Sequence, residues 1–301
     1  QEEDKVNGVY VGGASNTSVI RSVWNGGIKK VDWGGGFDYE AFDMKSTASS
    51  KRFLTAAPNV QYINSDQSAF LYFLSSDTDI TRFNVVSYDS AGSVLDSGYM
   101  TVSLSDKYGY IACGTYDIEN SDAALWTNST PTTILNGAAY YTVQLSGSNS
   151  QEIFTFHIDS KCSKYTPIRL HWLNRLGGFD SFNFNLKSMK DVDIKRSSYL
   201  QEEHSFTGTR WQYDTASRGT TDYHIGTQDK LTVNTDYLTE AESVWMEDFA
   251  TSPVIYQEVN NELIAMSGKP KKIKQQTSLN DKLMQYTFEL DYSLTNSRQR
   301  G

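Results

Sequence analysis

The sequence contains only 5 prolines and 2 cysteines in 301 residues. So few prolines exclude a proline-rich linker or another low-complexity chain. The two cysteines, Cys113 and Cys162, lie in separate segments and do not form the disulfide framework that staples small secreted domains. Buried thiols are the default interpretation of both, with one disulfide as the alternative. A reducing assembly compartment fits this cysteine usage.

Positive charge is also scarce. The chain has 27 Lys and Arg against 36 Asp and Glu, which gives a formal net charge of -9. Phosphate binding needs a basic face, so this balance argues against specific nucleic-acid binding. The one short basic run, between Lys269 and Lys274, is typical of a solvated loop or an edge strand. No apolar stretch approaches the roughly 18 to 20 residues of a membrane span.

Motifs that carry chemistry are missing as well. The sequence has no Walker loop, no Gly-x-Gly-x-x-Gly and no Gly-x-Ser-x-Gly elbow, and it has no EF-hand-type calcium loop. The histidines lack metal-ligand spacing; they are His157, His171, His204 and His224. We therefore expect no catalytic residue, no cofactor and no metal, and a chain that is not an enzyme. His157 and His171 lie within expected strands, where a hydrogen-bonded structural role is the default.

Aromatic residues, by contrast, are plentiful, with 19 Tyr and 14 Phe. Tyr, Phe, Thr and Val favour strands, and Ser, Asn, Asp and Gly supply turns. The expected strands are Val6–Val11, Val19–Trp24, Ile28–Trp33, Ala69–Leu74, Phe83–Tyr88, Gly98–Leu104, Tyr110–Cys113, Ala139–Leu145, Glu152–Ile158, Ile168–Leu173, Ser181–Leu186 and Met284–Tyr292. Short strands at this spacing indicate a mainly β fold of antiparallel sandwich-like or barrel-like domains.

The chain changes character near residue 160, so we expect an N-terminal β-rich domain at 1–160 and a C-terminal β domain at 161–301. The last expected strand alternates strictly: Met284, Phe288 and Leu290 share one face with two tyrosines, and polar residues occupy the other. A slip of one residue would turn this whole apolar face to solvent, so its register should be firmly fixed.

One α-helix is expected near 240–250, packed on the C-terminal sheet. Thr239 and Glu242 form a capping-box pattern at its start, and Ser252-Pro253 ends it. The expected apolar stripe consists of Ala241, Val244, Trp245 and Phe249, with Glu240, Glu247 and Asp248 outside it.

The run from Leu170 to Phe184 contains the pattern Trp-x-Asn-x-x-Gly-Gly-x-Asp-x-aromatic-x-Phe. This pattern resembles one found in tail-associated structural proteins (minor tail or neck type) of phages and prophages of Bacteroidetes-type hosts. Two further blocks look similar, one from Leu238 to Tyr256 and one beginning at Asn280. The resemblance covers about residues 165 to 295, and the first half of the chain matches only in its β-rich character.

The motif residues look structural. Asn174 can bridge a tight turn, Gly177 and Gly178 permit positive φ, and Asp180 can bond to nearby amides. Trp172 and Phe182 would pack across the two strands that the turn connects. Together with Thr239 and Trp245 of the helix, these are the residues expected to hold the interacting structure.

The resemblance implies a virion structural protein of a tailed phage, located in the tail or neck and assembled in the host cytoplasm. Its partners would be other copies of itself, in a homo-oligomeric ring, and other virion proteins.

Two alternatives stay open. A carbohydrate-binding β-sandwich, such as a surface or receptor-binding adhesin, would contact glycans through exposed rings; the tryptophan candidates are Trp24, Trp33, Trp126 and Trp211. A glycoside-cleaving enzyme would need a carboxylate pair. The candidate carboxylates are Asp191 with Asp193 on one strand face, and Asp117, Glu119 and Asp122 in a loop. Solvated faces are the simpler interpretation of both groups.

Overall fold

The structure is a computed structural model. It describes residues 5–6, 9–10, 27, 39–44, 51–75, 82–101, 108–146, 150–159, 164–201, 204–213, 219–268, 284–294 and 296–300. Several sequence-based expectations lie outside these residues: the strands at 19–24 and 28–33, Cys162, Trp24, Trp33, the lysines at 269–274 and the block at 280–283.

The chain forms two compact units. Unit 1 comprises residues 1–61, 68–158 and 174–180, and unit 2 comprises residues 62–67, 159–173 and 181–301. The expectation of domains at 1–160 and 161–301 stays a prediction. The two units interleave more than a single boundary would give, because each takes a short segment from the other's part of the sequence.

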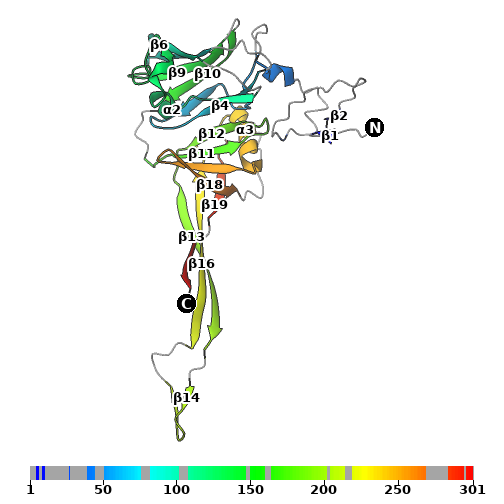
Figure 1. The fold of residues 1–301 in the computed structure, drawn as a ribbon, viewed down its shortest axis with the longest axis vertical. Helices are drawn as coiled ribbons and strands as arrows, with labels where there is room; N and C mark the ends of the chain where they lie inside the picture. The colour runs from blue at the N-terminus through cyan, green and yellow to red at the C-terminus, as the bar shows by residue number, and fades with distance from the viewer. Residues whose placement is uncertain are drawn as a thin grey trace. The chain divides into compact units, whose positions relative to one another are not determined.

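Unit 1 is built on a sheet with the strand order β3-β10-β9-β5-β6-β8, in which the strands from β10 to β8 pair antiparallel. These strands are β3 (Val60–Ile63), β5 (Arg82–Tyr88), β6 (Val94–Thr101), β8 (Trp126–Thr127), β9 (Tyr140–Ser146) and β10 (Ser150–Ile158). A second, two-stranded sheet pairs β4 (Phe70–Leu74) with β7 (Tyr108–Ala112), and β1 (Lys5–Val6) pairs with β2 (Val9–Tyr10). Figure 1 labels β1, β2, β4, β6, β9 and β10 among these strands.

The core of unit 1 follows from alternation along these strands. In β5 the residues Phe83, Val85 and Ser87 are buried, whereas their neighbours are half-buried or exposed. β9 pairs with β5 and contributes Tyr141, Val143 and Leu145, which are also fully buried. This period of two is what a half-buried antiparallel strand requires.

Three short helical turns complete unit 1: η1 (Tyr39–Phe42), α2 (Thr115–Glu119) and η2 (Ala123–Leu125). Asp117, Glu119 and Asp122 were expected in a loop, which was wrong for Asp117 and Glu119, because both lie in α2. Asp117 lies in α2 and accepts hydrogen bonds from Ser68 Oγ at 2.9 Å, from Ala69 N at 3.0 Å and from Gly114 N at 3.1 Å. Its carboxylate thus caps the helix start and fixes the neighbouring strand.

Unit 2 contains an eight-stranded sheet with the order β12-β11-β17-β18-β19-β16-β13, and β20 also pairs with β16. The strands are β11 (Ile168–Leu173), β12 (Phe179–Phe184), β13 (Met189–Leu200), β16 (Thr220–Asn234), β17 (Ile255–Val259), β18 (Glu262–Gly268), β19 (Thr287–Tyr292) and β20 (Asn296–Arg300). The alternation expected at Met284–Tyr292 is present in part in β19, where Phe288 and Leu290 are buried and Thr287 and Glu289 are exposed. The strand begins at Thr287 and not at Met284, and Asp291, expected on the polar face, is buried.

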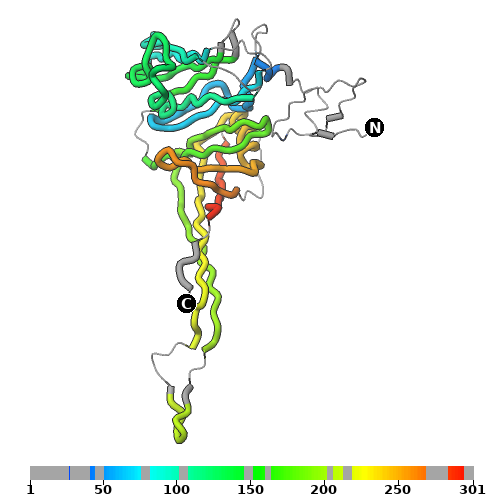
Figure 2. Tube along the Cα trace, viewed as in Figure 1, coloured from blue at the N-terminus to red at the C-terminus, as the bar shows by residue number. Residues whose placement is uncertain are grey.

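Two strands of unit 2 are much longer than the rest. β13 and β16 pair along the whole of β13, from Met189 opposite Thr232 to Leu200 opposite Thr220. They run beyond the rest of the sheet as a ribbon coiled about itself (Figures 1 and 2). β20 flanks β16 at residues 224–227, and only the outer end of the ribbon, at residues 220–223, is two-stranded among the described strands. We call this pair of strands the ribbon. Between its strands the chain forms a small hairpin of β14 (His204–Phe206) and β15 (Trp211–Tyr213), which we call the tip hairpin.

The expected helix is confirmed as α3 (Glu240–Thr251). Thr239 is its N-cap, its side chain and Glu242 make both halves of the capping box, and Ser252 is the C-cap. The expected apolar stripe was partly wrong. Trp245 and Phe249 are buried, but Val244 is exposed and Asp248 is buried. The helix is turned so that Ser243 faces inward, where its hydroxyl lies 2.6 Å from the Tyr286 hydroxyl.

The expected fold class is confirmed: the protein is mainly β, with antiparallel sheets in a sandwich-like arrangement and few helices.

Candidate functional site

The turn between β11 and β12 is organised by one side chain of unit 1, Asn174. Its Oδ1 accepts hydrogen bonds from the amides of Leu176 at 2.9 Å and Gly178 at 3.0 Å. Its Nδ2 donates to Asp180 Oδ1 and to the carbonyl of Leu54, both at 2.9 Å. Asn174 therefore makes four buried contacts that hold the turn against a distant part of the chain. This is the bridging role that the motif suggested.

Two different constraints require glycine at the two positions of the turn, Gly177 and Gly178. Gly177 has a φ of +90°, which a side chain rarely adopts. Gly178 is not among the positive-φ residues, so the expectation that it permits positive φ was wrong. Instead, a Cβ at Gly178 would lie 2.7 Å from the Leu54 carbonyl oxygen and 3.0 Å from Tyr72 Cβ. Close approach of two backbone segments excludes any side chain there.

The remaining motif residues join an aromatic cluster in unit 2. Trp172 and Phe182 both contact Trp245 of α3, with ring centroids 5.1 and 5.9 Å apart. Trp172 is fully buried, and its Nε1 has no hydrogen-bond partner within the described part of the chain. These contacts fasten α3 to β11 and β12, so the two tryptophans and Phe182 act in packing.

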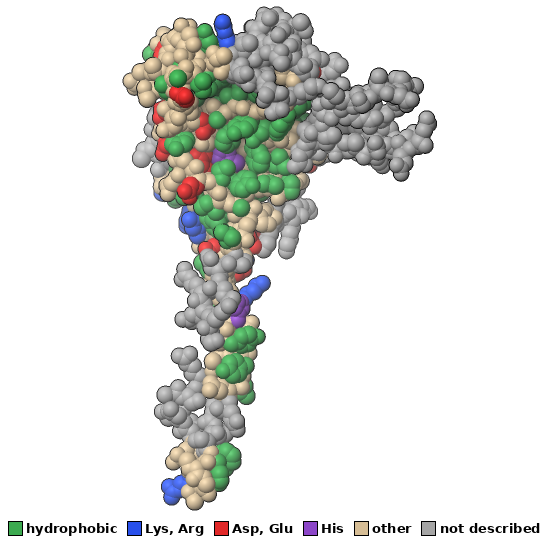
Figure 3. Space-filling model, in the orientation of Figure 1, with side chains coloured by type: hydrophobic (Ala, Val, Ile, Leu, Met, Phe, Trp, Pro, Cys, Tyr) green, Lys and Arg blue, Asp and Glu red, His purple; other side chains and the backbone are tan. Residues whose placement is uncertain are grey.

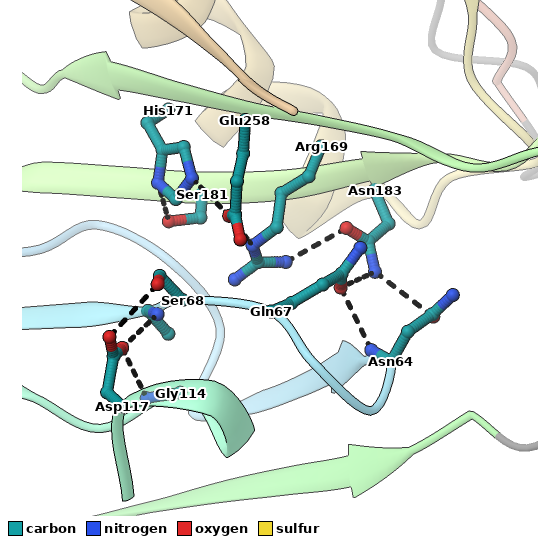
Figure 4. A network of polar contacts seen from close by, with 11 residues as sticks. Asn64, Gln67, Ser68, Gly114, Asp117, Arg169, His171, Ser181, Asn183 and Glu258 are labelled. Carbon is teal, nitrogen blue, oxygen red and sulfur yellow. Dashed lines mark hydrogen bonds and ion pairs between the residues drawn. The ribbon is translucent and has the colours of Figure 1, made fainter. Parts of the chain in front are cut away.

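A second feature of unit 2 was largely missed from the sequence, namely a buried polar network on β11, β12 and β17 (Figure 4). The His171 Nδ1 lies 2.8 Å from Ser181 Oγ, and its Nε2 lies 2.7 Å from Glu258 Oε2. Arg169 Nε lies 3.5 Å from the same carboxylate oxygen, and Arg169 Nη1 donates to Asn183 Oδ1 at 2.9 Å. The network therefore joins three neighbouring strands.

The charges of this network balance when His171 is neutral. Arg169 compensates Glu258, and both side chains are nearly inaccessible to solvent. Burial lowers the pKa of His171, although its hydrogen bond to Glu258 opposes that change. A neutral imidazole with its proton on Nε2 donates to Glu258 and accepts from the Ser181 hydroxyl, which satisfies both ring nitrogens.

The order hydroxyl, imidazole, carboxylate is also that of a nucleophilic triad, in which the hydroxyl attacks a substrate. A nucleophile has to meet its substrate, and Ser181 is only 6% exposed while His171 is 1% exposed. Arg169 further occupies the carboxylate that would orient the base. The arrangement is suited to holding strands together, in line with the structural role expected for His171.

One sequence signal could have revealed the network. Arg169 and His171 alternate with Ile168 and Leu170 on β11, and Ser181 and Asn183 alternate with phenylalanines on β12. Both strands are buried on both faces, so the polar side chains of the two strands have to form hydrogen bonds with other buried groups. Glu258 could not be found this way, because its strand lies far away in the sequence.

The other carboxylates suspected from the sequence do not gather into a site. Asp122 accepts a hydrogen bond from the amide of Ala124 and caps η2. Asp193 pairs with Lys230 across the ribbon. In the described ranges no group of three or more His, Cys, Asp or Glu could hold a metal ion, and no helix there is long and apolar enough to cross a membrane.

The aromatic residues of unit 1 form a platform on one face of the β4–β7 sheet. Tyr72 stacks on Tyr110, with ring centroids 5.4 Å apart, and contacts Tyr108 at 5.8 Å and Phe179 at 6.1 Å. Tyr110 is 60% exposed. Burial, with the neighbouring Tyr108 and Tyr110, raises the pKa of Tyr72 to about 12, so its hydroxyl stays a hydrogen-bond donor. The tryptophans contribute little here, because Trp126 is buried.

The ribbon and the tip hairpin expose large hydrophobic side chains, and Figure 3 shows patches of them on the described parts of both. They are Met189, Val192, Ile194, Tyr199, Leu200 and Tyr223 on the strands, and Phe206 and Trp211 on the tip hairpin. Leu200 is 81% exposed and Trp211 is 71% exposed. Phe206 lies opposite Trp211 across the hairpin, with ring centroids 5.3 Å apart. Apolar surface of this kind marks an interaction site.

Comparison with known proteins identifies no relative, since no family model and no curated protein matches the chain.

Proposed function

We propose that this protein is a virion structural component of a tailed phage, a tail, neck or ring protein that acts by subunit assembly. The observation that carries the proposal is the ribbon of unit 2. The resemblance of the chain to tail-associated proteins, at Trp172 to Phe184, points to the same class of protein.

The outer end of the ribbon has little to stabilise it in a single protomer. Residues 220–223 of β16 pair only with β13 among the described strands, and β13 is exposed over nearly all of its length. A two-stranded β-structure without a covered face is marginally stable in water. Exposed apolar side chains on such a structure become useful when another subunit covers them, and the gain is about 25 cal/mol for each Å² of apolar surface removed from water.

The remaining features of the molecule suit a scaffold for this ribbon. The network of His171, Glu258 and Arg169 and the cluster around Trp245 both tie the strands of unit 2 together. A rigid sheet fixes the direction in which the ribbon leaves it. Assembly proteins need this rigidity, because each subunit has to present its interface in one geometry.

The experiment that tests the proposal is recovery of the protein in particles. Particles purified from cells that carry the gene should contain the chain at many copies per particle, detected by quantitative mass spectrometry. A variant with Phe206→Ser and Trp211→Ser should be incorporated less, while a control with Leu263→Ser, exposed on β18, should be incorporated normally. Complete absence of the unmodified chain from the particles would contradict the proposal.

A second candidate is the carbohydrate-binding module, and the observation in its favour is the aromatic platform at Tyr72, Tyr108 and Tyr110. Ring faces stack on sugar C–H groups, and protonated phenols supply hydrogen bonds. A glycan array with the whole chain tests it. Binding to a glycan, lost in Tyr110→Ala and kept in Tyr62→Ala, which alters an equally exposed tyrosine elsewhere, would favour this candidate.

A further inference from the structure

The outer edge of β13 is open in the described structure. β13 is the last strand of its sheet, with β16 on one side and no described strand on the other. It runs for twelve residues, and all of them are exposed except the half-buried Ser197. Long exposed edges are templates for pairing with another chain, and proteins usually shorten, bulge or cover them.

The edge of β13 lacks the usual protection. The pairing register with β16 shifts between Ser197 and Ser198, opposite His224 and Asp222. The extra residue is Tyr223, so the bulge belongs to β16 and β13 itself stays regular. No proline lies in β13. Charged residues remain as the one feature that could prevent edge pairing.

Those charges change sign twice along the strand: Lys190 is followed by the two acidic residues Asp191 and Asp193, and these by the two basic residues Lys195 and Arg196. Such a pattern repels many partners but can complement a reversed copy of itself. Two identical antiparallel strands that continue one sheet place residues of the same face opposite each other. Each possible alignment therefore has one residue on the two-fold axis, facing its own copy.

The charges select one alignment. An axis at Lys190, Asp191, Asp193, Lys195 or Arg196 places that charge against its own copy, and an axis at Val192 places Asp191 against Asp193. Axes at Met189 and from Ser197 to Leu200 also avoid like-charge pairs within β13, but they join no opposite charges and pair only part of the strand. An axis at Ile194 avoids like-charge pairs, joins opposite charges and pairs residues 189–199. It places Asp193 opposite Lys195 twice, Ile194 opposite Ile194, and Met189 opposite Tyr199.

The neighbouring strand leaves room for Lys195 in this arrangement, whereas the Asp193 carboxylate already pairs with Lys230 of β16 and would be shared between two lysines. Lys195 lies opposite Gly226 of β16, so no side chain stands across from it within its own protomer. Its ammonium group is therefore placed to meet a carboxylate of the added strand. Val192 and Ile194 share one face, so pairing would also join the apolar stripes of the two ribbons into one.

We propose that β13 pairs with β13 of a second copy of this chain, antiparallel and with Ile194 on the two-fold axis. This inference rests on the proposed assembly function and specifies one of its contacts. The contact is isologous, which means that both subunits use the same surface and the contact is complete with two copies. A ring of more copies would therefore need a second, different surface.

A single cysteine tests the register. Opposite Cβ atoms lie about 4.5 to 5.5 Å apart in such a pair, close to the separation that a disulfide spans. Ile194→Cys in the full chain should therefore form a disulfide-linked dimer under mild oxidation. Lys190→Cys is the matched control on the same face, because its two copies would lie roughly 26 Å apart and should not cross-link. Equal cross-linking of both variants, or none by Ile194→Cys, would overturn the register.

A charge exchange tests the pairing itself. Asp193→Lys alone places lysines opposite each other, and Lys195→Asp alone places aspartates opposite each other, so each variant should associate at least tenfold more weakly than the unmodified chain. Mixing the two variants restores both opposite-charge pairs and should give the mixed dimer in native mass spectrometry. Recovery on mixing also shows that both variants are folded. Unchanged association of the single variants would overturn the proposal.

The two proposals fail in different ways. If the chain still oligomerises and enters particles but passes neither test, β13 pairing is wrong and some other strand or surface makes the contact. If the chain does not enter particles at all, the proposed function is wrong even where β13 pairs.

Discussion

At the scale of single residues, most of the polar groups with a defined geometry bind other parts of the same chain. Asn174 contacts four groups around its turn, and His171 lies between a hydroxyl and a carboxylate. Each is buried, so losing one partner leaves the other unsatisfied, which costs about 1 to 3 kcal/mol. Stability rather than turnover should therefore report on these residues.

His171 should make the stability of the protein depend on pH. Its pKa in the folded state is lowered by burial, whereas in the unfolded chain it lies near about 6.5. As the pH falls below that value, the unfolded chain takes up a proton that the folded protein resists. The free energy of unfolding should therefore decrease from about pH 6.5 towards the lower folded-state pKa.

The measurement is urea unfolding of the full chain at a series of pH values between 7 and 5. His171→Gln removes the titrating group, so its free energy of unfolding should fall less steeply with acidification than that of the unmodified protein. Identical slopes for the two proteins would show that His171 takes up its proton equally in both states.

Gly178 should tolerate no side chain. A Cβ there would lie 2.7 Å from the Leu54 carbonyl oxygen, a backbone atom that is also bound by Asn174. Gly178→Ala should lower the free energy of unfolding by about 2 kcal/mol, as overpacking of a tight site does.

Gly226→Ala is the matched control, because its Cβ would meet only His224 Nε2 at an ordinary 3.5 Å. Denaturant unfolding should show a change within about 0.5 kcal/mol for that variant. An equally small change for Gly178→Ala would mean that the two backbone segments separate easily.

At the scale of elements, α3 shows how the helix is fixed at its start. Thr239 Oγ1 accepts a hydrogen bond from the Glu242 amide, and Glu242 accepts one from the Thr239 amide at 2.8 Å. Thr239→Ala removes the first of these and should lower the free energy of unfolding by about 1 kcal/mol. Thr239→Ser keeps the hydroxyl and should retain most of that stability, as measured by thermal unfolding. A serine variant as unstable as the alanine variant would point to packing of the threonine methyl group instead.

Local signals in the sequence predicted the elements better than their surroundings. The capping box and Ser252-Pro253 located α3 within one residue at each end, and alternation located β5 and β19. The buried face of α3 was misjudged at Val244 and Asp248, because the contact of Ser243 with Tyr286 depends on a strand distant in sequence. The aromatic positions Trp172 and Trp245 were recognised as packing residues, but the partner of His171, Glu258, required the sheet order.

The ribbon was the element least visible in the sequence. Residues 189–200 mix charged and apolar residues and were considered only as a possible carboxylate pair at Asp191 and Asp193. A strand normally reveals itself through one buried face, and β13 is exposed on both faces. The pattern that makes the ribbon hard to predict is the same pattern that suggests a partner.

At the scale of the whole molecule, the chain contains parts that maintain their own structure and a ribbon that, in the proposed function, binds other subunits. The turn at Asn174, the network at His171 and the cluster at Trp245 belong to the first group. The exposed side chains of Ile194, Tyr223 and Trp211 belong to the second. The proposed role in a virion requires both, since such a subunit has to be rigid in isolation and to bind its partners at defined places.

The most direct test of this claim is the mass of the full-length protein in solution, measured by sedimentation velocity over a range of concentrations. The unmodified chain should form species well above the protomer mass of 33.9 kDa. A variant with Val192→Thr, Ile194→Thr and Tyr223→Thr should shift towards the protomer, while Val259→Thr with Leu263→Thr, exposed on a neighbouring hairpin, should not. An unmodified protein that is folded and strictly monomeric at every concentration would contradict the account.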